Sequence, residues 1–388
     1  MRRIAAQYLF TGKPPLLRHG MVTLDDTHRV VEVGQWDGAE TAHTEFYNGV
    51  LSPGFVNAHC HLELSHLKGV VAPQAGMARF LETMMKLPRG TVDETAQQLA
   101  DEQMRKEGVV AVGDICNTPV SFEVKRKSAI YYHSFIEVAG ISEEVTETRK
   151  AAATGLLKEA AEAGLAATVT PHAPYSMNES LFAFAVETAQ RQCILSIHNQ
   201  ESEEENALFL QGGGALHTLF SSMGFPEPHP TGLTSLHRIL PLLRETTRLL
   251  LVHNTVTSAV DCEAVYATTR NVSWVLCPNS NRYITGMLPP AGLFFSKGAP
   301  VAIGTDSLAS NTQLSVLEEL KTLAQHFSQI PLETLLQWAT YGGAQALRKE
   351  QELGLLEAGR RPGLVLIENL DLHQLKLTAD ATAKTMIE

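Results

Sequence analysis

The chain has 388 residues, a net charge of −11 and a hydrophobic share of 44%. This length allows two average domains, or one large α/β barrel with an appendage. The acidic charge, with no run rich in lysine or arginine, argues against nucleic acid or a membrane surface as a partner. No apolar stretch of about eighteen residues and no signal-peptide pattern occurs, so we expect a cytoplasmic protein.

The cysteines are odd in number, scattered, and form no CxxC pair. This pattern predicts reduced thiols in a cytosolic protein rather than a disulfide framework or a zinc knuckle. They are Cys60, Cys116, Cys193, Cys262 and Cys277.

The beginning of the chain has short alternating apolar runs, such as RIAAQYLF and RVVEVGQ, which predict half-buried strands. The run GRRPGLVLIENL, at 359–370, predicts another strand near the other end. We therefore expect residues 1–50 and 355–388 to form a small β-sandwich domain built from both termini. Residues 51–354 would then form the catalytic domain.

Within 51–354, near-continuous apolar runs alternate with segments of helical spacing, of which 91–108 and 148–164 each end in glycine. Such alternation predicts a parallel sheet covered on both faces. Eight strands over about 250 residues predict a (β/α)8 TIM-type barrel, with a doubly wound open sheet as the alternative. The runs are 54–61, 108–115, 129–138, 165–173, 193–199, 249–256, 272–280 and 300–307.

Two longer stretches, 64–90 and 202–237, follow the first and fifth of these runs. Insertions after the strands of a barrel lie at its catalytic mouth, so we expect both stretches to act as lids. Three acidic residues in the second stretch are expected to be solvated. These are Glu203, Glu204 and Glu205.

Polar side chains stand at the ends of the apolar runs. His59 and His61 are two residues apart, so both face the same side of the first strand. His198 ends the fifth run, His253 the sixth and Asp306 the eighth. Burying such groups together costs roughly a few kcal/mol each unless they are paired or bound to a metal.

Three neutral imidazoles and one carboxylate suit Zn²⁺, with Fe²⁺ or Mn²⁺ as alternatives. Each residue alone has a structural explanation, since Asp306 could simply cap the next helix. Their combination on strands one, five and eight predicts a metal site. Because no lysine stands at the end of strand four or five to bridge a second ion, we expect one metal. The predicted ligands are His59, His61, His198 and Asp306.

Further polar residues stand at the same mouth. Glu201 follows His198 by three residues, where its carboxylate can face the metal and act as a proton shuttle. Glu63 faces the same mouth and is the second candidate for that role, as well as a candidate substrate contact. His172 and Asn279, at the ends of strands four and seven, are expected to contact substrate.

These motifs resemble the amidohydrolase superfamily, and specifically its mononuclear aminohydrolase branch. That branch includes cytosine, guanine, adenosine and S-adenosylhomocysteine deaminases and the s-triazine hydrolases. The similarity runs nearly end to end, and within the branch HCHLELS looks most like the aminodeoxyfutalosine deaminases. The matching runs are SPGFVNAHCH, PHAPYS, HNQE, VHNTV, CPNSN and GTDSLASN.

The resemblance implies metal ligation by the four predicted ligands, with His253 over the reacting water. It makes Glu201 the acid/base residue and Asp306 a second proton acceptor. The implied reaction is hydrolytic deamination of an amino-substituted N-heterocycle, best an adenine-type nucleoside such as 6-aminodeoxyfutalosine. The alternatives are a hydrolytic dehalogenase, an amide or imine hydrolase, and a scaffold that has lost its site. A homodimer is left open.

Arginines near the mouth suggest an anionic substrate. Arg282 directly follows CPNSN, and Arg79 and Arg89 lie in the first expected lid. An arginine grips a carboxylate with two parallel hydrogen bonds, and aminodeoxyfutalosine carries a benzoate remote from its adenine amine. We therefore expect at least one of the three to contact this tail. The alternative is that all three are ordinary surface arginines.

Overall fold

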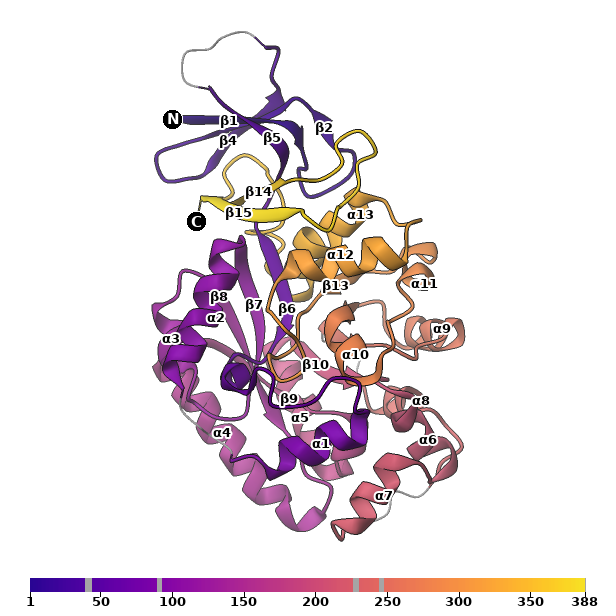
Figure 1. Cartoon of the computed structure of the whole chain (residues 1–388). Coiled ribbons are helices and arrows are strands. Elements are labelled where there is room, and N and C mark those ends of the chain that lie inside the picture. The colour runs from indigo at the N-terminus through magenta and orange to yellow at the C-terminus, as the bar shows by residue number, and fades with distance from the viewer. Residues whose placement is uncertain (39–43, 89–92, 226–229, 244–247, 388) are drawn as a thin grey trace.

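The computed structural model describes residues 1–38, 44–88, 93–225, 230–243 and 248–387 of a mixed α/β protein. Strands from both ends of the chain lie together at one end of the molecule, and the remaining strands and helices form its larger part (Figure 1). No helix within these ranges is long and apolar enough to cross a membrane.

The terminal strands pair in one sheet of order β15-β14-β5-β1-β3-β4, with β2 attached to β1. Strand β5 runs parallel to β1 and antiparallel to β14, so it connects the strands from the two ends of the chain. A second layer, as in a sandwich, stays a prediction. The strands are β1 Arg2–Leu9, β2 Leu17–Arg18, β3 Gly20–Leu24, β4 Val30–Gln35, β5 Thr44–Ser52, β14 Leu364–Glu368 and β15 Thr382–Ile387.

The larger part contains two four-stranded sheets, of order β6-β7-β8-β9 and β10-β11-β12-β13, in which all neighbours are parallel. Each predicted apolar run overlaps one of these strands, and β7 and β11 each extend one residue beyond their run. They are β6 Phe55–Cys60, β7 Val109–Cys116, β8 Tyr131–Val138, β9 Ala166–Pro171, β10 Ile194–Asn199, β11 Arg248–His253, β12 Val272–Leu276 and β13 Val301–Ile303.

Main-chain hydrogen bonds link the two sheets at both outer edges, near their carboxyl ends. The amide of His198 donates to the carbonyl of His172 over 2.9 Å, and the amide of Asp306 donates to the carbonyl of His59 over 3.0 Å. Cys60 and Asp306 also form an isolated parallel bridge. Pairing of the edge strands along their full length, which a closed barrel requires, stays a prediction.

Helices connect the parallel strands (Figure 1). Their ends follow capping rules, since the Asn178 side chain accepts from the Leu181 amide at the start of α5. The α-helices are α1 Met77–Lys86, α2 Glu94–Lys106, α3 Phe122–Lys127, α4 Thr146–Glu162, α5 Glu179–Gln192, α6 Glu203–Gln211, α7 Ala215–Ser222, α8 Ser235–Ile239, α9 Ala259–Thr268, α10 Pro278–Thr285, α11 Ala291–Ser296, α12 Val316–His326, α13 Leu332–Gln337 and α14 Gly343–Ala346. The 3-10 turns are η1 Leu62–Leu67, η2 Glu143–Val145, η3 Pro174–Ser176 and η4 Leu240–Leu242, and η5 Trp338–Gly342 is a π-helical turn.

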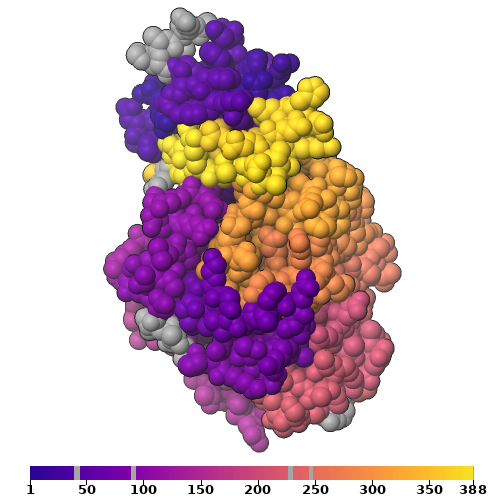
Figure 2. All heavy atoms as spheres, in the orientation of Figure 1, coloured from indigo at the N-terminus to yellow at the C-terminus, as the bar shows by residue number. Residues whose placement is uncertain are grey.

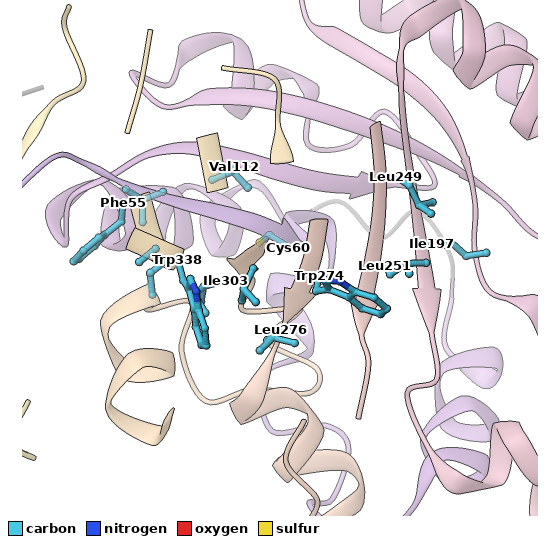
Figure 3. Packing of buried hydrophobic residues seen from close by; sticks show 14 of the residues in the cluster. Phe55, Cys60, Val112, Ile197, Leu249, Leu251, Trp274, Leu276, Ile303 and Trp338 are labelled. Atoms are coloured by element: carbon cyan, nitrogen blue, oxygen red, sulfur yellow. The ribbon is translucent and has the colours of Figure 1, made fainter. Parts of the chain in front are cut away.

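Both faces of the parallel strands are buried, which explains why the sequence shows continuous apolar runs there. Leu251, Trp274 and Ile303 belong to the cluster drawn in Figure 3. Their chain neighbours Val252 and Ala302 belong to a second cluster, because successive side chains of a strand point to opposite faces.

The two insertions predicted as lids lie against each other. The first contains α1 and overlaps η1, and the second contains α6 and α7 and overlaps α8. The Glu204 carboxylate accepts hydrogen bonds from the amides of Met77 and Ala78 at the start of α1, over 3.1 and 3.0 Å. Figure 2 shows the purple atoms of the first insertion lying across the front of the molecule.

Candidate metal centre and active site

Four histidines converge at the carboxyl ends of β6, β10 and β11. His59 lies in β6, and its ring centroid is 5.0 Å from that of His61 and 4.8 Å from that of His198. His253, the last residue of β11, is 5.5 Å from His59 by the same measure. The spacing of two residues therefore brings His59 and His61 to one side, as the sequence predicts. All four side chains are largely or fully buried.

Asp306 adds a carboxylate to this group. Its Oδ1 lies 3.2 Å from Nε2 of His61 and 3.6 Å from Nε2 of His59. The two histidine Nε2 atoms are themselves 3.2 Å apart. Ligand atoms of His59, His61 and Asp306 all lie within 4.8 Å of one another, and so do those of His59, His198 and His253. The structure thus brings the four predicted ligands together, with His198 joined through His59.

Asp306 and His198 each have one atom held by hydrogen bonds and a second atom that is available to bind an ion in the cluster. Oδ2 of Asp306 accepts hydrogen bonds from the hydroxyls of Ser280 and Ser310, each over 2.6 Å, which leaves Oδ1 for an ion. Nδ1 of His198 donates to the carbonyl of His172 over 2.8 Å, so Nε2 carries the lone pair. This donor set fits a divalent cation, whose ligands are held by such outer hydrogen bonds.

Burial keeps the imidazoles of His61, His198 and His253 neutral. It lowers the pKa of His61 and His253 well below the ordinary value and that of His198 to about 4. Burial alone would raise the pKa of Asp306, but the hydrogen bond with His59 and the nearby His61 and His253 hold it well below the ordinary value. Neutral imidazoles and an ionised carboxylate are the forms that bind metals.

Glu201 lies beside this cluster. Its Oε1 is 3.5 Å from Nε2 of His253, and ligand atoms of Glu201, His253 and Asp306 lie within 4.8 Å of one another. Burial, together with the charges of Asp306 and Glu205, raises the pKa of Glu201 well above the ordinary value. A carboxyl group that holds its proton near neutral pH can act as a general acid.

Glu205 is buried, and the prediction that it is solvated is wrong. Its carboxylate accepts hydrogen bonds from the amides of Gln200 and Glu201, over 3.0 and 2.9 Å. These amides lie in the sharp turn after β10, beyond the last residue that pairs with β11. Glu205 thereby fixes the turn that carries Glu201. Its neighbour Glu203 is exposed, as predicted.

The turns at the strand ends adopt unusual backbone conformations. Gln200, His253, Asn254 and Asp306 have φ values of 47°, 75°, 57° and 58°. Left-handed conformations are uncommon for residues other than glycine and cost of order 1 kcal/mol or more each, so the surrounding hydrogen bonds must hold them. Nδ2 of the Asn254 side chain, for example, donates a hydrogen bond to the carbonyl of Leu251 over 2.6 Å.

Three predicted substrate contacts have polar partners within the chain. The Glu63 carboxylate accepts from the amides of Asn117 and Thr118 and from the Thr118 hydroxyl, and burial raises its pKa to about 7. Nδ1 of His172 lies 2.7 Å from the Ser176 hydroxyl, and its ring centroid is 4.9 Å from that of His198. The Asn279 carbonyl oxygen accepts from Thr322 in α12 over 2.6 Å. Their contacts with substrate stay predictions.

The three arginines occupy different situations. Arg282 is exposed on α10. Arg79 is exposed on α1 and forms an ion pair with Glu82. Arg89 lies outside the described residues. Contact between any of them and an anionic substrate stays a prediction.

Three residues that touch the site were not singled out from the sequence. Ser280 and Ser310 bind Asp306, and Nδ2 of Asn281 lies 3.1 Å from Nδ1 of His253. All three lie in the runs CPNSN and GTDSLASN, but serine and asparagine after a strand are also common helix caps. The sequence signal that could have identified them was their position in these two runs, soon after the ends of β12 and β13.

Comparison with known proteins identifies the family. Residues 50–387 match the Amidohydrolase family, and the chain belongs to it. An adenosine deaminase of Helicobacter pylori is 28% identical over 373 residues, which cover 92% of this chain and 89% of that protein. By its family and its relatives the chain is an aminohydrolase, and its buried histidines and Asp306 form a cluster that could hold a metal ion.

Two solved structures share the fold. The aminofutalosine deaminase of Helicobacter pylori, in complex with methylthio-coformycin, is 25% identical with a TM-score of 0.82, covering 96% of this chain and 93% of that one. The atrazine chlorohydrolase TrzN of Arthrobacter aurescens, a mutant complexed with zinc and atraton, is 16% identical with a TM-score of 0.77, covering 100% and 95%. The second likeness concerns the fold alone.

Proposed function

We propose that this protein hydrolytically deaminates an adenine-type nucleoside. The observation that carries the proposal is the buried carboxyl group of Glu201 beside His253 and Asp306, with ligand atoms within 4.8 Å of one another. An acid at that position can serve a leaving amine, which needs a proton. The names of the relatives, an adenosine deaminase and an aminofutalosine deaminase, support an adenine-type substrate.

One divalent ion, zinc before iron or manganese, would be held by the four predicted ligands. Zinc is bound in the related atrazine chlorohydrolase, and three imidazoles with one carboxylate are a donor set that zinc accepts. When bound, the ion supplies Lewis acidity that lowers the pKa of water from about 15.7 towards 7, so that hydroxide is available near neutral pH. The ligands are His59, His61, His198 and Asp306.

The chain's own groups would move the protons. Glu201 donates its proton to the ring nitrogen next to the amine-bearing carbon, which makes this carbon electrophilic. Asp306 and His253 orient the water that adds to it, and Asp306 accepts a proton. Glu201, now ionised, takes the proton of the added hydroxyl group and passes it to the departing amine, so that ammonia leaves. The proton held by Asp306 then restores the acid form of Glu201. A positioned acid or base of this kind typically contributes about 10²–10⁴-fold in rate.

We propose further that the substrate carries an anionic tail, as 6-aminodeoxyfutalosine does. Arg282 is the best placed of the three arginines, because Arg79 already pairs with Glu82. Arg282 lies on α10, the helix whose residues Ser280 and Asn281 touch the site. Glu63, His172 and Asn279 stay candidate contacts at the same mouth.

The direct test is ammonia release by the purified protein from purines, pterins, pyrimidines and 5′-substituted adenosines. We expect turnover of the adenosines, and of a carboxylated 5′-substituted adenosine most of all. Replacing the amine by chlorine tests the dehalogenase alternative, because chloride needs no proton to leave. Chloride release with no ammonia release would overturn the proposal, as would the absence of both reactions in metal-loaded protein.

The tail proposal predicts that Arg282→Met raises KM for the carboxylated adenosine 10–100-fold, about 1.4–2.7 kcal/mol, and changes kcat much less. The same variant assayed on a neutral 5′-substituted adenosine is the control. Equal loss on both substrates would exclude anion recognition by Arg282.

The architecture carries proposals of its own. We propose that the two parallel sheets close into one (β/α)8 barrel over residues 51–354, and that 1–50 and 355–388 form a sandwich-like unit. The main-chain bonds of His198 and Asp306 across the two edges support closure.

We also propose a cytoplasmic protein that does not bind nucleic acid. A homodimer is the assembly to test by light scattering.

A further inference from the structure

Asn281 and His253 form a buried pair at the active site. Both side chains are fully buried, and Nδ2 of Asn281 lies 3.1 Å from Nδ1 of His253. The other ring nitrogen of His253, Nε2, is buried and has no hydrogen-bond partner among the described residues. It faces the cluster, 3.5 Å from Oε1 of Glu201.

This contact decides which ring nitrogen of His253 carries the proton. An amide NH2 group can only donate, so Nδ1 must accept, and a neutral ring then keeps its proton on Nε2. With the Asn281 amide turned the other way, Oδ1 would face Nδ1 of His253, and both N–H groups would lie where Oδ1 now has no hydrogen-bond partner within the described ranges. Turning the amide would leave two buried N–H groups unpaired, whereas the present orientation leaves one N–H and one carbonyl oxygen. Buried N–H groups without a partner are rarer than such carbonyl oxygens, which favours the present orientation.

His198 has the opposite tautomer, for the same kind of reason. Its Nδ1 lies 2.8 Å from the carbonyl oxygen of His172 and 3.6 Å from a carboxylate oxygen of Glu137. Both oxygens can only accept, so His198 carries its proton on Nδ1 and has its lone pair on Nε2. The rings of His198 and His253 are stacked, with centroids 5.3 Å apart. Nε2 of His198 can therefore bind a cation, whereas Nε2 of His253, which carries the proton, cannot.

We propose that Asn281 is a positioning residue that holds His253 in the Nε2–H tautomer and thereby excludes His253 from the metal ligands. The buried N–H then points at the oxygen atom that adds to the substrate, and donates to it. This inference deepens the proposed function and rests on it for the identity of that oxygen. The choice of tautomer itself depends only on the hydrogen bonds of the metal-free protein.

The first experiment is ¹⁵N NMR of the metal-free protein labelled at histidine, with His253→Gln to assign the His253 signals. We expect the proton of His253 on Nε2 and that of His198 on Nδ1. A wild-type protein with the His253 proton on Nδ1 would overturn the inference. This measurement needs neither substrate nor turnover, so it fails or succeeds independently of the deaminase proposal.

The second experiment reverses the hydrogen bond. In Asn281→Asp the carboxylate can only accept, so the proton moves to Nδ1 and the Nε2 lone pair faces the metal site. We expect the variant to bind zinc about 10-fold or more tightly than wild type. Removing a hydrogen bond to a metal ligand usually has the opposite effect and weakens metal affinity. We expect kcat to fall about 10²-fold, with a smaller change in KM. Asn281→Leu, which adds no charge, should give a mixture of tautomers.

Two controls separate this effect from charge alone. Asn279→Asp adds the same charge two residues away, where the side chain already accepts from Thr322, and should leave the His253 tautomer unchanged. In a His253→Phe background, Asn281→Asp should no longer tighten zinc binding. A tightening that persists without His253, or that Asn279→Asp reproduces in full, would show an electrostatic effect and overturn the assignment.

Discussion

The two oxygen atoms of the Asp306 carboxylate have different surroundings. Oδ2 is held by two serine hydroxyls, whereas Oδ1 faces the Nε2 atoms of His59 and His61. The side chain therefore has one orientation before any ion binds. The same division between an anchored atom and an available atom is seen in His198, which is anchored through Nδ1. Such preorganisation lowers the cost of assembling a metal site.

At the residue scale, we predict that Glu201 is required for turnover but not for metal binding. Glu201→Gln keeps the shape of the side chain but cannot relay a proton, so kcat should fall on the order of 10²-fold or more while metal content and fold are retained. The exposed neighbour Glu203→Gln is the matched control and should keep full activity. Ammonia release and elemental analysis measure the two properties separately. A Glu201→Gln enzyme with normal kcat would move the shuttle to another group, with Glu63 next.

The residue-scale predictions from sequence succeeded where strand geometry dictates direction. His59 and His61 had to share a side because alternate strand residues do so. Glu205 was misjudged because its partners, the amides of Gln200 and Glu201, become available only in the folded turn. Asn281 was missed for a similar reason. Its role depends on a contact with His253 across 28 residues of chain.

At the scale of elements, β7 and α3 hold the loop that follows β6. Asp114 Oδ2 lies 2.5 Å from Lys125 Nζ, with neither side chain exposed. Asp114 Oδ1 accepts from the amide of Leu62 over 2.7 Å, directly after His61. The buried ion pair therefore anchors the turn on which His61 stands.

Breaking this pair should destabilise the fold. Lys125→Met leaves an uncompensated buried carboxylate, which typically costs about 3–5 kcal/mol in the free energy of unfolding. The control Lys127→Met removes a largely exposed charge of the same helix and should change stability little. Urea unfolding measures both. An unchanged midpoint for Lys125→Met would contradict a stabilising role of the buried ion pair.

Strand positions could be predicted because burial on both faces leaves a continuous apolar run, as in β11 and β12. Strand ends were less predictable. The run at 300–307 contains β13, which is only 3 residues long, since the chain then turns to pair with His59. Such a turn depends on the opposite sheet. The second layer expected at the terminal sheet likewise depends on packing that periodicity alone does not encode.

At the scale of the whole molecule, buried carboxyl groups should make stability depend on pH. Burial raises the pKa of Glu319 to about 8, although hydrogen bonds from Asn279 and Asn311 oppose the shift. The folded protein therefore binds this proton more tightly than the unfolded chain does. The resulting stabilisation is complete below the ordinary carboxyl pKa of about 4.3 and is lost as the pH rises to about 8.

Glu319→Gln should remove this contribution, so the difference in unfolding free energy between wild type and variant should change by a few kcal/mol between about pH 5 and 8. Buried histidines change the stability with pH in the opposite direction. Because wild type and variant share them, their contribution cancels in the difference. Denaturant titrations at several pH values measure it. A pH-independent difference would show that Glu319 is ionised throughout.

We propose above all that one divalent ion, held by His59, His61, His198 and Asp306, serves an adenosine-type deaminase. The most direct measurement is a zinc titration of metal-free protein, following ammonia release from a carboxylated 5′-substituted adenosine. The rate should rise with added zinc and level off at about one equivalent per chain, and His61→Ala should stay inactive throughout. A rate that levels off only at two equivalents, or ammonia release that is complete without added metal, would contradict the account.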